Sequence, residues 1–373
     1  PGVGIWPPVT LLEIEAKLRE KGFFDIDIID AEAEEYNLTE LVRQITIKSP
    51  DLAVVQATVP TINDDILLVS LLKRSLPNAE IVFVGLAPTT MPKELLENKQ
   101  LDYVVIGEPE QVICELAEHR LNKKLRLSEI SGLGYKENGE VFINKRRTSP
   151  ESYDYPVFPD YSRIDMNKYR LSLTGKPFAV VKTSVGCDYS CSFCTSEVYY
   201  GKGWRARSPE NIVKEIENIK FRQKIDNFLF LSDTFNGNSK FVGDLATLIL
   251  SHGLKIKWVS NSRVDLVYEE QAALMKKSGC LLVSLGIESF DRDILKRNNK
   301  FINPEHIKRG IEIFNKQGIL TYGYFIFGLE GETRISVFKT MFKAWCSRLD
   351  FASFYTLTPY PGTVYFSRFE NRN

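Results

Sequence analysis

The sequence lacks several features that would assign it to a specialised class of protein. Its 373 residues contain no apolar run of the roughly 18 residues that a membrane-spanning helix requires, and no secretory leader is visible. Lysine plus arginine and aspartate plus glutamate both number 48, so the formal net charge is zero. A nucleic-acid-binding protein normally carries a basic excess. We therefore expect neither a membrane span nor a nucleic-acid partner.

Cysteine and histidine are also scarce. Six cysteines are too few for a disulfide scaffold in a chain of this length, and the sequence has only three histidines. Apolar residues (43%) and charged residues (26%) are present in ordinary proportions, which argues against disorder. The length exceeds what one hydrophobic core usually serves. These properties together predict a cytoplasmic α/β protein of at least two domains.

The first third of the chain alternates short strand-like runs with helical patterns. Strands are expected at residues 26–29, 52–56, 81–84 and 103–106, and helices at 11–18, 37–47, 66–72 and 92–98. Such alternation predicts a parallel sheet with helices on both faces. The chain opens at Pro1, in a loop ahead of a helix. We therefore expect residues 1–125 to form a Rossmann-like domain that lacks its first strand.

The alternation breaks between residues 126 and 172, which we expect to form a linker. Asn138-Gly139, the preferred residues for a tight turn, predict a hairpin over residues 132–143. Several prolines among tyrosines and charged residues then suit a connecting segment on the surface. The basic run at residues 145–147 is interpreted as an exposed part of this linker.

Alternation resumes with longer elements in residues 173–373. Six strands are expected, at residues 178–184, 227–232, 256–260, 281–287, 320–327 and 351–357. Amphipathic helical patterns fill the gaps between them. Six βα units are too few for a closed eight-fold barrel, so we expect a partial (β/α)6 barrel whose reactive face lies at the carboxyl ends of its strands.

Three of the cysteines cluster directly after the first of these six strands. Cys187, Cys191 and Cys194 are spaced four and three residues apart, so three thiolates on one loop can wrap a soft metal centre. An iron–sulfur cube has four irons, so three cysteines leave one iron open for chemistry. The alternatives are a structural zinc site and incidental core cysteines. Zinc sites usually pair two cysteine couples or add histidines at a set spacing, which the sequence does not show.

This CxxxCxxC spacing, with Phe193 before the last cysteine, resembles the radical S-adenosylmethionine (SAM) superfamily. With the Rossmann-like first domain, the resemblance extends over nearly the whole chain to the branch that carries a cobalamin-binding domain. That branch includes cobalamin-dependent radical SAM methylases and the anaerobic Mg-protoporphyrin monomethyl ester cyclase. The resemblance implies that Cys187, Cys191 and Cys194 ligate a 4Fe-4S cluster, that SAM chelates the open iron, and that Phe193 lies close to the adenine.

Further SAM contacts are expected at the ends of the following strands. The superfamily's Gly-Gly-Glu element is absent and Asp233 stands in its place, where it could accept a hydrogen bond from the SAM ammonium. Arg263 suits the SAM carboxylate, and Glu288 is placed to meet the ribose hydroxyls or the ammonium. Gly328 would let the adenine approach the backbone. The alternatives are that Arg263 and Glu288 pair with each other and that Gly328 is an ordinary turn glycine.

The cobalamin contacts are predicted from loop positions alone. The Asp-x-His-x-x-Gly motif of many cobalamin domains is absent, as it commonly is in this branch. Small and hydroxylated residues after the strands suit a nucleotide tail along the sheet edge. The candidates are Thr58, Thr61, Gly85, Thr89, Gly107 and Glu108. The alternative is a domain kept for packing or for substrate binding.

The resemblance implies a radical SAM enzyme that cleaves SAM to a 5′-deoxyadenosyl radical and methylates an unactivated carbon with cobalamin. A radical SAM cyclase or rearrangement enzyme is the alternative, and a non-enzymatic cobalamin or metal sensor is an alternative of another class. A methylthiotransferase is disfavoured because the first domain has only Cys114. We expect a small-molecule, lipid or tetrapyrrole-like substrate and an electron donor such as flavodoxin or ferredoxin.

The remaining motifs have mainly structural interpretations. Tyr360 lies in a Thr-Pro-Tyr-Pro-Gly-Thr run that either lines the substrate cavity or forms a rigid proline turn. Cys280 and Cys346 are interpreted as small core residues. Arg207 is expected in a solvated loop after the cysteines, the alternative being that it holds an anionic group of the substrate. No general acid or base is predicted.

Overall fold

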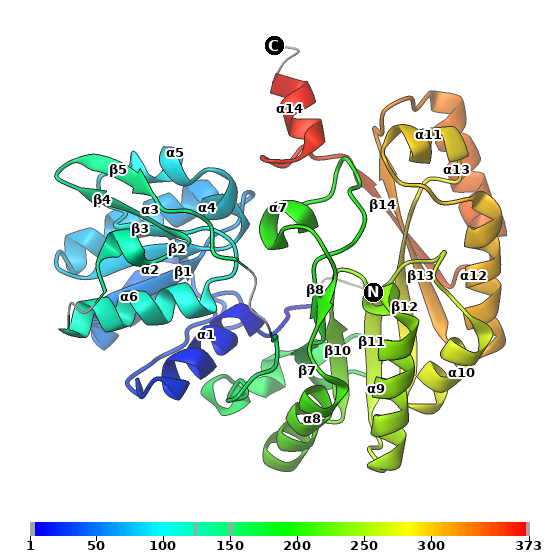
Figure 1. The fold of residues 1–373 in the computed structure, drawn as a ribbon, viewed down its shortest axis with the longest axis horizontal. Helices are drawn as coiled ribbons and strands as arrows, with labels where there is room; N and C mark the ends of the chain where they lie inside the picture. Colours follow the sequence, from blue (N-terminus) through cyan, green and yellow to red (C-terminus); the bar gives the residue numbers. More distant parts are fainter. Residues whose placement is uncertain (1–3, 123–124, 149–151, 371–373) are drawn as a thin grey trace.

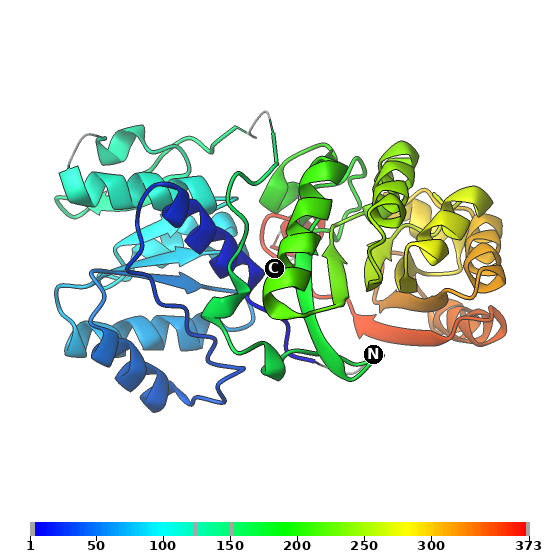
Figure 2. The same ribbon diagram turned by 90° about the horizontal axis from the view of Figure 1, so that it is seen from below.

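The fold was analysed in a computed structural model, which describes residues 4–122, 125–148 and 152–370. Two α/β domains lie side by side, one built mainly from the first third of the chain and one from the second half (Figures 1 and 2). Within these ranges no helix combines the length and the apolar character needed to cross a membrane.

The first domain contains a five-stranded sheet in sequential order. Its strands are β1 (Leu52–Gln56), β2 (Glu80–Val84), β3 (Tyr103–Val105), β4 (Leu133–Glu137) and β5 (Glu140–Ile143). β1, β2 and β3 are parallel, and the predicted hairpin, β4 and β5, pairs antiparallel to β3. Asn138 and Gly139 turn it with positive φ values of 52° and 84°, as a tight type I′ turn requires. The sheet of this domain therefore extends beyond residue 125 into the segment expected to be a linker.

Helices cover both faces of this sheet, as predicted. They are α1 (Val9–Glu20), α2 (Leu38–Lys48), α3 (Ile62–Ser75), α4 (Leu86–Thr90), α5 (Pro92–Leu96) and α6 (Glu110–Asn122). Along β2, Val82 and Val84 join one hydrophobic cluster with α1 and α6, while Ile81 and Phe83 join another with α2 and α3. This alternation follows from the two-residue period of a strand, and it confirms the Rossmann-like architecture.

The prediction of a strand at residues 26–29 is wrong. This segment has no regular secondary structure, and no described strand pairs with it. The Ile26 carbonyl instead accepts a hydrogen bond of 3.0 Å from the guanidinium of Arg163. A run of β-favouring residues forms a strand only when a neighbour supplies its hydrogen bonds.

The second domain is built on a curved seven-stranded sheet. In spatial order its strands are β14 (Phe351–Thr356), β13 (Leu320–Phe327), β12 (Cys280–Glu288), β11 (Lys257–Ser262), β10 (Asn227–Leu231), β7 (Lys176–Lys182) and the short antiparallel β6 (Arg170–Leu171). The other six strands are parallel, which confirms the partial (β/α)6 barrel.

Helices form the outer layer of this barrel (Figure 2). The longer ones are α8 (Pro209–Gln223), α9 (Ser239–Ser251), α10 (Glu269–Lys277), α12 (Pro304–Lys316) and α13 (Arg334–Cys346). The shorter elements are η1 (Leu127–Glu129), η2 (Tyr161–Arg163), η3 (Met166–Lys168), β8 (Ser184–Val185), α7 (Ser196–Tyr200), β9 (Arg205–Ala206), η4 (Phe235–Gly237), α11 (Arg292–Arg297) and α14 (Val364–Glu370). Helix α12 lies so close to the loop after β11 that a Cβ on Gly310 would come within 2.2 Å of the Val264 carbonyl oxygen.

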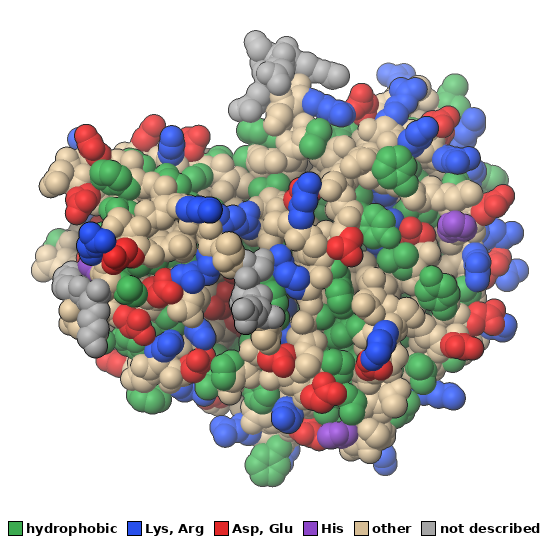
Figure 3. Space-filling model, in the orientation of Figure 1, with side chains coloured by type: hydrophobic (Ala, Val, Ile, Leu, Met, Phe, Trp, Pro, Cys, Tyr) green, Lys and Arg blue, Asp and Glu red, His purple; other side chains and the backbone are tan. Residues whose placement is uncertain are grey.

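Three expectations about individual side chains are corrected. Arg146 is not an exposed linker residue, because its guanidinium donates a hydrogen bond of 2.8 Å to the Val198 carbonyl. Arg207 is not solvated but 2% exposed, in a buried ion pair with Glu215. Cys346 is exposed on α13, whereas Cys280 is buried as expected. On the face shown in Figure 3, basic and acidic side chains are interspersed, in keeping with the zero net charge.

Candidate functional site

The three clustered cysteines lie on the loop between β8 and α7, beyond the carboxyl end of the first barrel strand. All three thiols are free and half-buried. The Cys187 Sγ lies 3.3 Å from the Thr234 hydroxyl, and the Ser196 N–H points at the Cys194 Sγ from 3.5 Å. The structure thus presents three soft sulfur donors on a partly accessible loop, which fits an iron–sulfur cluster by its ligand chemistry.

Neighbouring segments hold this loop in place. The Ser192 N–H donates to the Asn298 carbonyl at 3.0 Å, and the Asn299 side-chain amide donates to the Ser190 carbonyl at 2.5 Å. From α14, the Tyr365 N–H donates to the Ser192 carbonyl at 3.2 Å. The loop is therefore anchored on both sides through its backbone.

Two opposing effects act on the ionisation of these thiols: burial disfavours the thiolate, and nearby cations favour it. Burial raises the pKa of Cys194 to about 12 and also raises the pKa of Cys191. The cations Lys300 and Arg263 act in the opposite direction on the pKa of Cys191. Metal ligation needs the thiolate, so these two cations support the ligand form. Among the described residues, no three His, Cys, Asp or Glu side chains lie close enough together to hold a single metal ion.

Glu288 ends β12 beside this loop and is paired with a lysine that the sequence analysis missed. The Lys300 ammonium lies 2.8 Å from the Glu288 carboxylate, and the two side chains are only 6% and 10% exposed. The same ammonium is 6.0 Å from the centre of the Phe193 ring. Glu288 has a positive φ of 65° next to an irregularity in strand pairing, a strained conformation typical of functional sites. A Cβ on Gly286 would come within 2.9 Å of the Glu288 Oε1, so this glycine makes room for the pair.

Arg263 and Asp233 both contact the cysteine loop. The Arg263 guanidinium stacks 3.5 Å from the centre of the Tyr189 ring and is paired with Asp265 at 2.9 Å. It therefore does not pair with Glu288. Asp233 accepts a hydrogen bond of 2.8 Å from the Gly186 N–H, immediately before Cys187, and burial raises its pKa. The SAM contacts assigned to both residues stay predictions.

Gly328 and Tyr360 lie in two turns after β13 and β14. Gly328 has a φ of 95°, and its N–H donates to the Glu332 carboxylate at 2.6 Å, so the glycine is required by its turn. The Tyr360 carbonyl accepts from the Thr363 hydroxyl at 2.6 Å within a second tight turn. Tyr360 is not among the described residues that line the cavity between the domains. Its role at a substrate cavity stays a prediction.

The predicted cobalamin residues fall into three groups at the carboxyl ends of β1, β2 and β3. The Thr89 hydroxyl donates to the Gly85 carbonyl at 2.7 Å and accepts from the Gly107 N–H at 2.9 Å, which connects two of these ends. Thr58 and Thr61 contact each other on the exposed side at 2.9 Å. Glu108 instead faces the second domain. The loops after β1 and β2 are also close together, since a Cβ on Gly85 would come within 2.7 Å of the Ala57 carbonyl oxygen.

A cavity of about 500 Å³ lies between the domains. Its lining includes Glu108 and Glu110 from the first domain, Tyr153 from the connecting segment, and Lys182 and Tyr200 from the barrel. Tyr153 donates a hydrogen bond of 3.0 Å to Glu108, and burial, followed by the charge of Glu110, raises the pKa of Glu108. Hydrogen-bond donors and acceptors thus surround a space large enough for a sizeable polar ligand.

Sequence patterns alone could identify only part of this arrangement. The cysteine spacing is a direct signal, whereas Lys300 lies in a polar stretch with no motif. Lys182 carried a weak signal, since it is a charged residue at the end of an otherwise apolar strand run, and such residues are rarely buried without a partner.

Family models match both domains. Residues 181–344 match the Radical SAM superfamily and residues 3–117 match the B12 binding domain. The chain is 35% identical over 358 residues to an uncharacterized methyltransferase of Pyrococcus horikoshii, covering 96% of this chain and 77% of that protein. It is 27% identical over 376 residues to the anaerobic magnesium-protoporphyrin IX monomethyl ester cyclase of Cereibacter sphaeroides, covering 99% of this chain and 61% of that protein.

A solved structure supports the fold. The radical S-adenosylmethionine methyltransferase TsrM from Kitasatospora setae, with cobalamin and a [4Fe-4S] cluster bound, superposes with a TM-score of 0.82 at 20% identity. The match covers 99% of this chain and 72% of TsrM. At this identity the likeness shows the arrangement of both domains and not the substrate.

Proposed function

The chain belongs to the radical SAM superfamily and also carries a B12-binding domain. We therefore propose that it is a cobalamin-dependent enzyme that methylates an unactivated carbon. The observation that carries the proposal is the cysteine loop. Three free thiols, the Glu288–Lys300 pair and Arg263 gather at the carboxyl ends of the barrel strands, beside a domain of the cobalamin-binding type.

The cofactors carry the difficult chemistry. When bound, the cluster and SAM supply a 5′-deoxyadenosyl radical, and cobalamin supplies the methyl group. Cys187, Cys191 and Cys194 would hold the cluster, and the backbone contacts of Ser190 and Ser192 would keep their loop in position.

Glu288 and Lys300 suit the amino-acid end of SAM. That end carries an ammonium and a carboxylate, and the pair offers one acceptor and one donor of opposite charge, 2.8 Å apart. Both side chains are buried, so their charge-assisted hydrogen bonds would be strong. Lys300 also lies near Phe193, the residue expected to contact the adenine. We propose that this pair, more than Arg263, binds the methionine part of SAM.

The cavity between the domains supports the cobalamin proposal. Glu108, Glu110 and Tyr153 present acceptors and a hydroxyl to a cofactor whose edge carries many amide groups. Gly107 has a φ of 83°, which favours glycine, and a Cβ there would come within 3.1 Å of the Arg146 guanidinium. We propose residues 1–125, with the hairpin that completes the sheet, as the cobalamin domain and residues 173–373 as the barrel.

A cyclase is the second candidate, since the magnesium-protoporphyrin cyclase aligns with 99% of this chain. Under either proposal the substrate is a small molecule, with a lipid or a tetrapyrrole as the specific candidates. We also propose that a small electron-transfer protein such as flavodoxin or ferredoxin reduces the cluster.

The test is product analysis of the purified chain, reconstituted without oxygen and supplied with SAM, hydroxocobalamin and dithionite. We expect both 5′-deoxyadenosine and S-adenosylhomocysteine. Deoxyadenosine alone would favour the cyclase, and neither product from protein with a full complement of iron and sulfide would refute the radical SAM proposal.

A further inference from the structure

A buried lysine lies between the two domains. Lys182 is the last residue of β7, and its side chain is 10% exposed. Its ammonium is paired with Glu13 of α1, which is 2% exposed, and lies 3.5 Å from Glu110 at the start of α6. Both carboxylates come from the first domain. Burial disfavours the charge, but Glu13, Tyr155 and Glu110 outweigh it and raise the pKa of Lys182, so the lysine is an ammonium.

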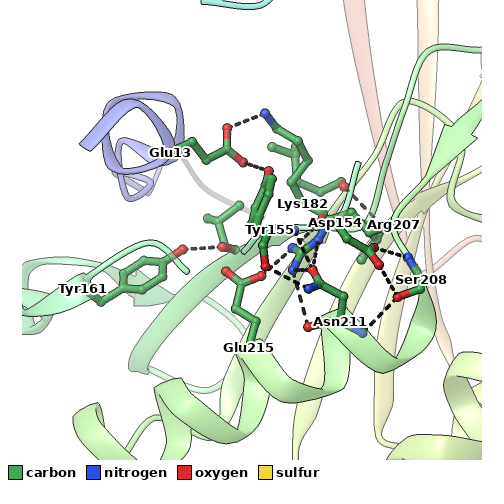
Figure 4. A network of polar contacts seen from close by, with 12 residues as sticks. Glu13, Asp154, Tyr155, Tyr161, Lys182, Arg207, Ser208, Asn211 and Glu215 are labelled. Atoms are coloured by element: carbon green, nitrogen blue, oxygen red, sulfur yellow. Dashed lines mark hydrogen bonds and ion pairs between the residues drawn. The ribbon is translucent and has the colours of Figure 1, made fainter. Parts of the chain in front are cut away.

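The connecting segment closes this contact from the other side. Tyr155 donates to the second oxygen of the Glu13 carboxylate (Figure 4). The centre of its ring lies 4.0 Å from the guanidinium carbon of Arg207. Arg207 in turn donates to the Lys182 carbonyl at 3.0 Å and is paired with Glu215 of α8. Helix α1, the connecting segment and the first barrel strand are thus joined in one polar network.

Lys182 is also close to the base of the cysteine loop. In the neighbouring strand β10, Leu231 is its pairing partner, and Asp233 lies two residues further on. Asp233 holds the N–H of Gly186 at 2.8 Å, and Lys182 lies four residues before that glycine. Lys182 thus contacts two carboxylates of the first domain, and it lies on a strand adjacent to the one that leads to Asp233.

A buried ion pair is weak evidence for stability, because desolvation offsets much of the attraction, but it can fix a geometry. Apolar packing also contributes to this interface, since Leu12 of α1 is fully buried in the hydrophobic cluster of the barrel. Arg19 and Arg163 form further hydrogen bonds between the first domain and the connecting segment. The network adds buried, directional contacts to this interface, beside a polar cavity of about 500 Å³.

We propose that Glu13, Tyr155 and Lys182 are positioning residues that set the cobalamin-binding domain at a fixed distance from the cluster loop. This rests on the proposed function. Glu13, Tyr155 and Lys182 also line the interdomain cavity, and their proposed role is to fix its geometry. Their loss would therefore separate radical formation from methyl transfer between the two sites.

The first test does not depend on turnover. Hydrogen–deuterium exchange is measured on the full-length chain at pH 8 for the wild type, Lys182→Met and Glu13→Gln, with Lys176→Met as the matched control. Lys176 is an exposed residue at the other end of the same strand. We expect about tenfold faster exchange in α1 and residues 152–161 of the first two variants and no change in the control. Unchanged exchange in Lys182→Met would overturn the proposal.

The second test separates positioning from a role at the cluster. Reconstituted Lys182→Met is given SAM, hydroxocobalamin and dithionite without substrate. We expect wild-type levels of bound cobalamin and of 5′-deoxyadenosine, and at least about tenfold less S-adenosylhomocysteine, whose formation needs both domains. Loss of bound cobalamin would overturn the proposal and assign Lys182 to cobalamin binding. A parallel loss of both products would overturn the proposal and assign Lys182 to the cluster site. If the wild type forms neither product, the proposed function fails, while the exchange result still decides whether the network holds the domains together.

The double variant Glu13→Gln/Lys182→Met distinguishes positioning from stability. Both charges are then absent, so no buried charge is left unpaired. We expect a melting temperature close to that of the wild type and a product ratio that stays low. Recovery of the ratio together with the melting temperature would overturn the proposal.

Discussion

Replacing Lys300 by methionine is the perturbation that tests the proposed SAM contact most sharply. Methionine keeps most of the volume of the lysine side chain but removes the ammonium that lies 2.8 Å from Glu288. Both side chains are at least nine-tenths buried, so the variant leaves a carboxylate without its partner. Breaking a buried pair in this way costs about 3–5 kcal/mol of stability.

The effect on SAM binding follows from the same geometry. A hydrogen bond to a charged group contributes about 1.5–3 kcal/mol. If Lys300 binds the SAM carboxylate, its loss should weaken SAM binding by about ten- to a hundredfold. The dissociation constant can be measured by equilibrium dialysis with labelled SAM on cluster-reconstituted protein.

Two controls separate the binding effect from the loss of stability. Lys296→Met removes an exposed lysine four residues earlier and should leave the affinity unchanged. Glu288→Gln/Lys300→Met removes both buried charges, and should recover stability but not the affinity for SAM. A dissociation constant for Lys300→Met within about twofold of the wild type would refute this assignment.

Three further predictions concern the cluster, the packing and the pH dependence. Cys191→Ala should lose most of the iron and sulfide bound after reconstitution, as measured by chemical analysis, whereas the exposed Cys346→Ser should retain both. Gly310→Ala places a Cβ 2.2 Å from the Val264 carbonyl and should lower the free energy of unfolding by about 1–3 kcal/mol in urea titrations, while Gly243→Ala, with nothing within 4 Å, should not. Burial raises the pKa of Glu13 to about 7, so the folded state binds this proton more tightly. Stability from this group is therefore complete below pH 4.5 and is lost as the pH rises through 7, and Glu13→Gln should flatten that part of a pH series of thermal unfolding. A steeper profile in Glu13→Gln would contradict this sign.

The sequence predicted the architecture where strands have neighbours to pair with. All six barrel strands were expected close to their observed positions, because long apolar runs alternate with amphipathic helices. The strand predicted at residues 26–29 is not formed. A strand needs hydrogen bonds from a neighbouring strand, and local composition does not show whether such a neighbour exists. Similarly, Arg146 and Arg207 were expected to be solvated. Arg146 instead donates to the Val198 carbonyl of the barrel, and Arg207 is paired with Glu215 of α8.

The residues of the candidate site also divide into those that a local motif predicts and those that only the tertiary fold brings together. The cysteine motif is local, so its spacing alone pointed to a cluster loop. Lys300 and Lys182 meet their partners only through the tertiary fold, across 12 residues to Glu288 and 169 residues to Glu13. Pairings at such separations are fixed by the packing of the strands and helices, and a single sequence carries no periodic signal for them.

The most direct test of the central claim is a label-transfer measurement on the wild-type chain. SAM carrying a trideuterated methyl group is incubated without oxygen with the reconstituted protein, hydroxocobalamin and dithionite, and the protein-bound cobalamin is examined by mass spectrometry. The account predicts that cobalamin gains the trideuterated methyl group and that labelled SAM yields S-adenosylhomocysteine in equal amount. Cobalamin that stays unlabelled on a protein with intact cluster and bound SAM would contradict it.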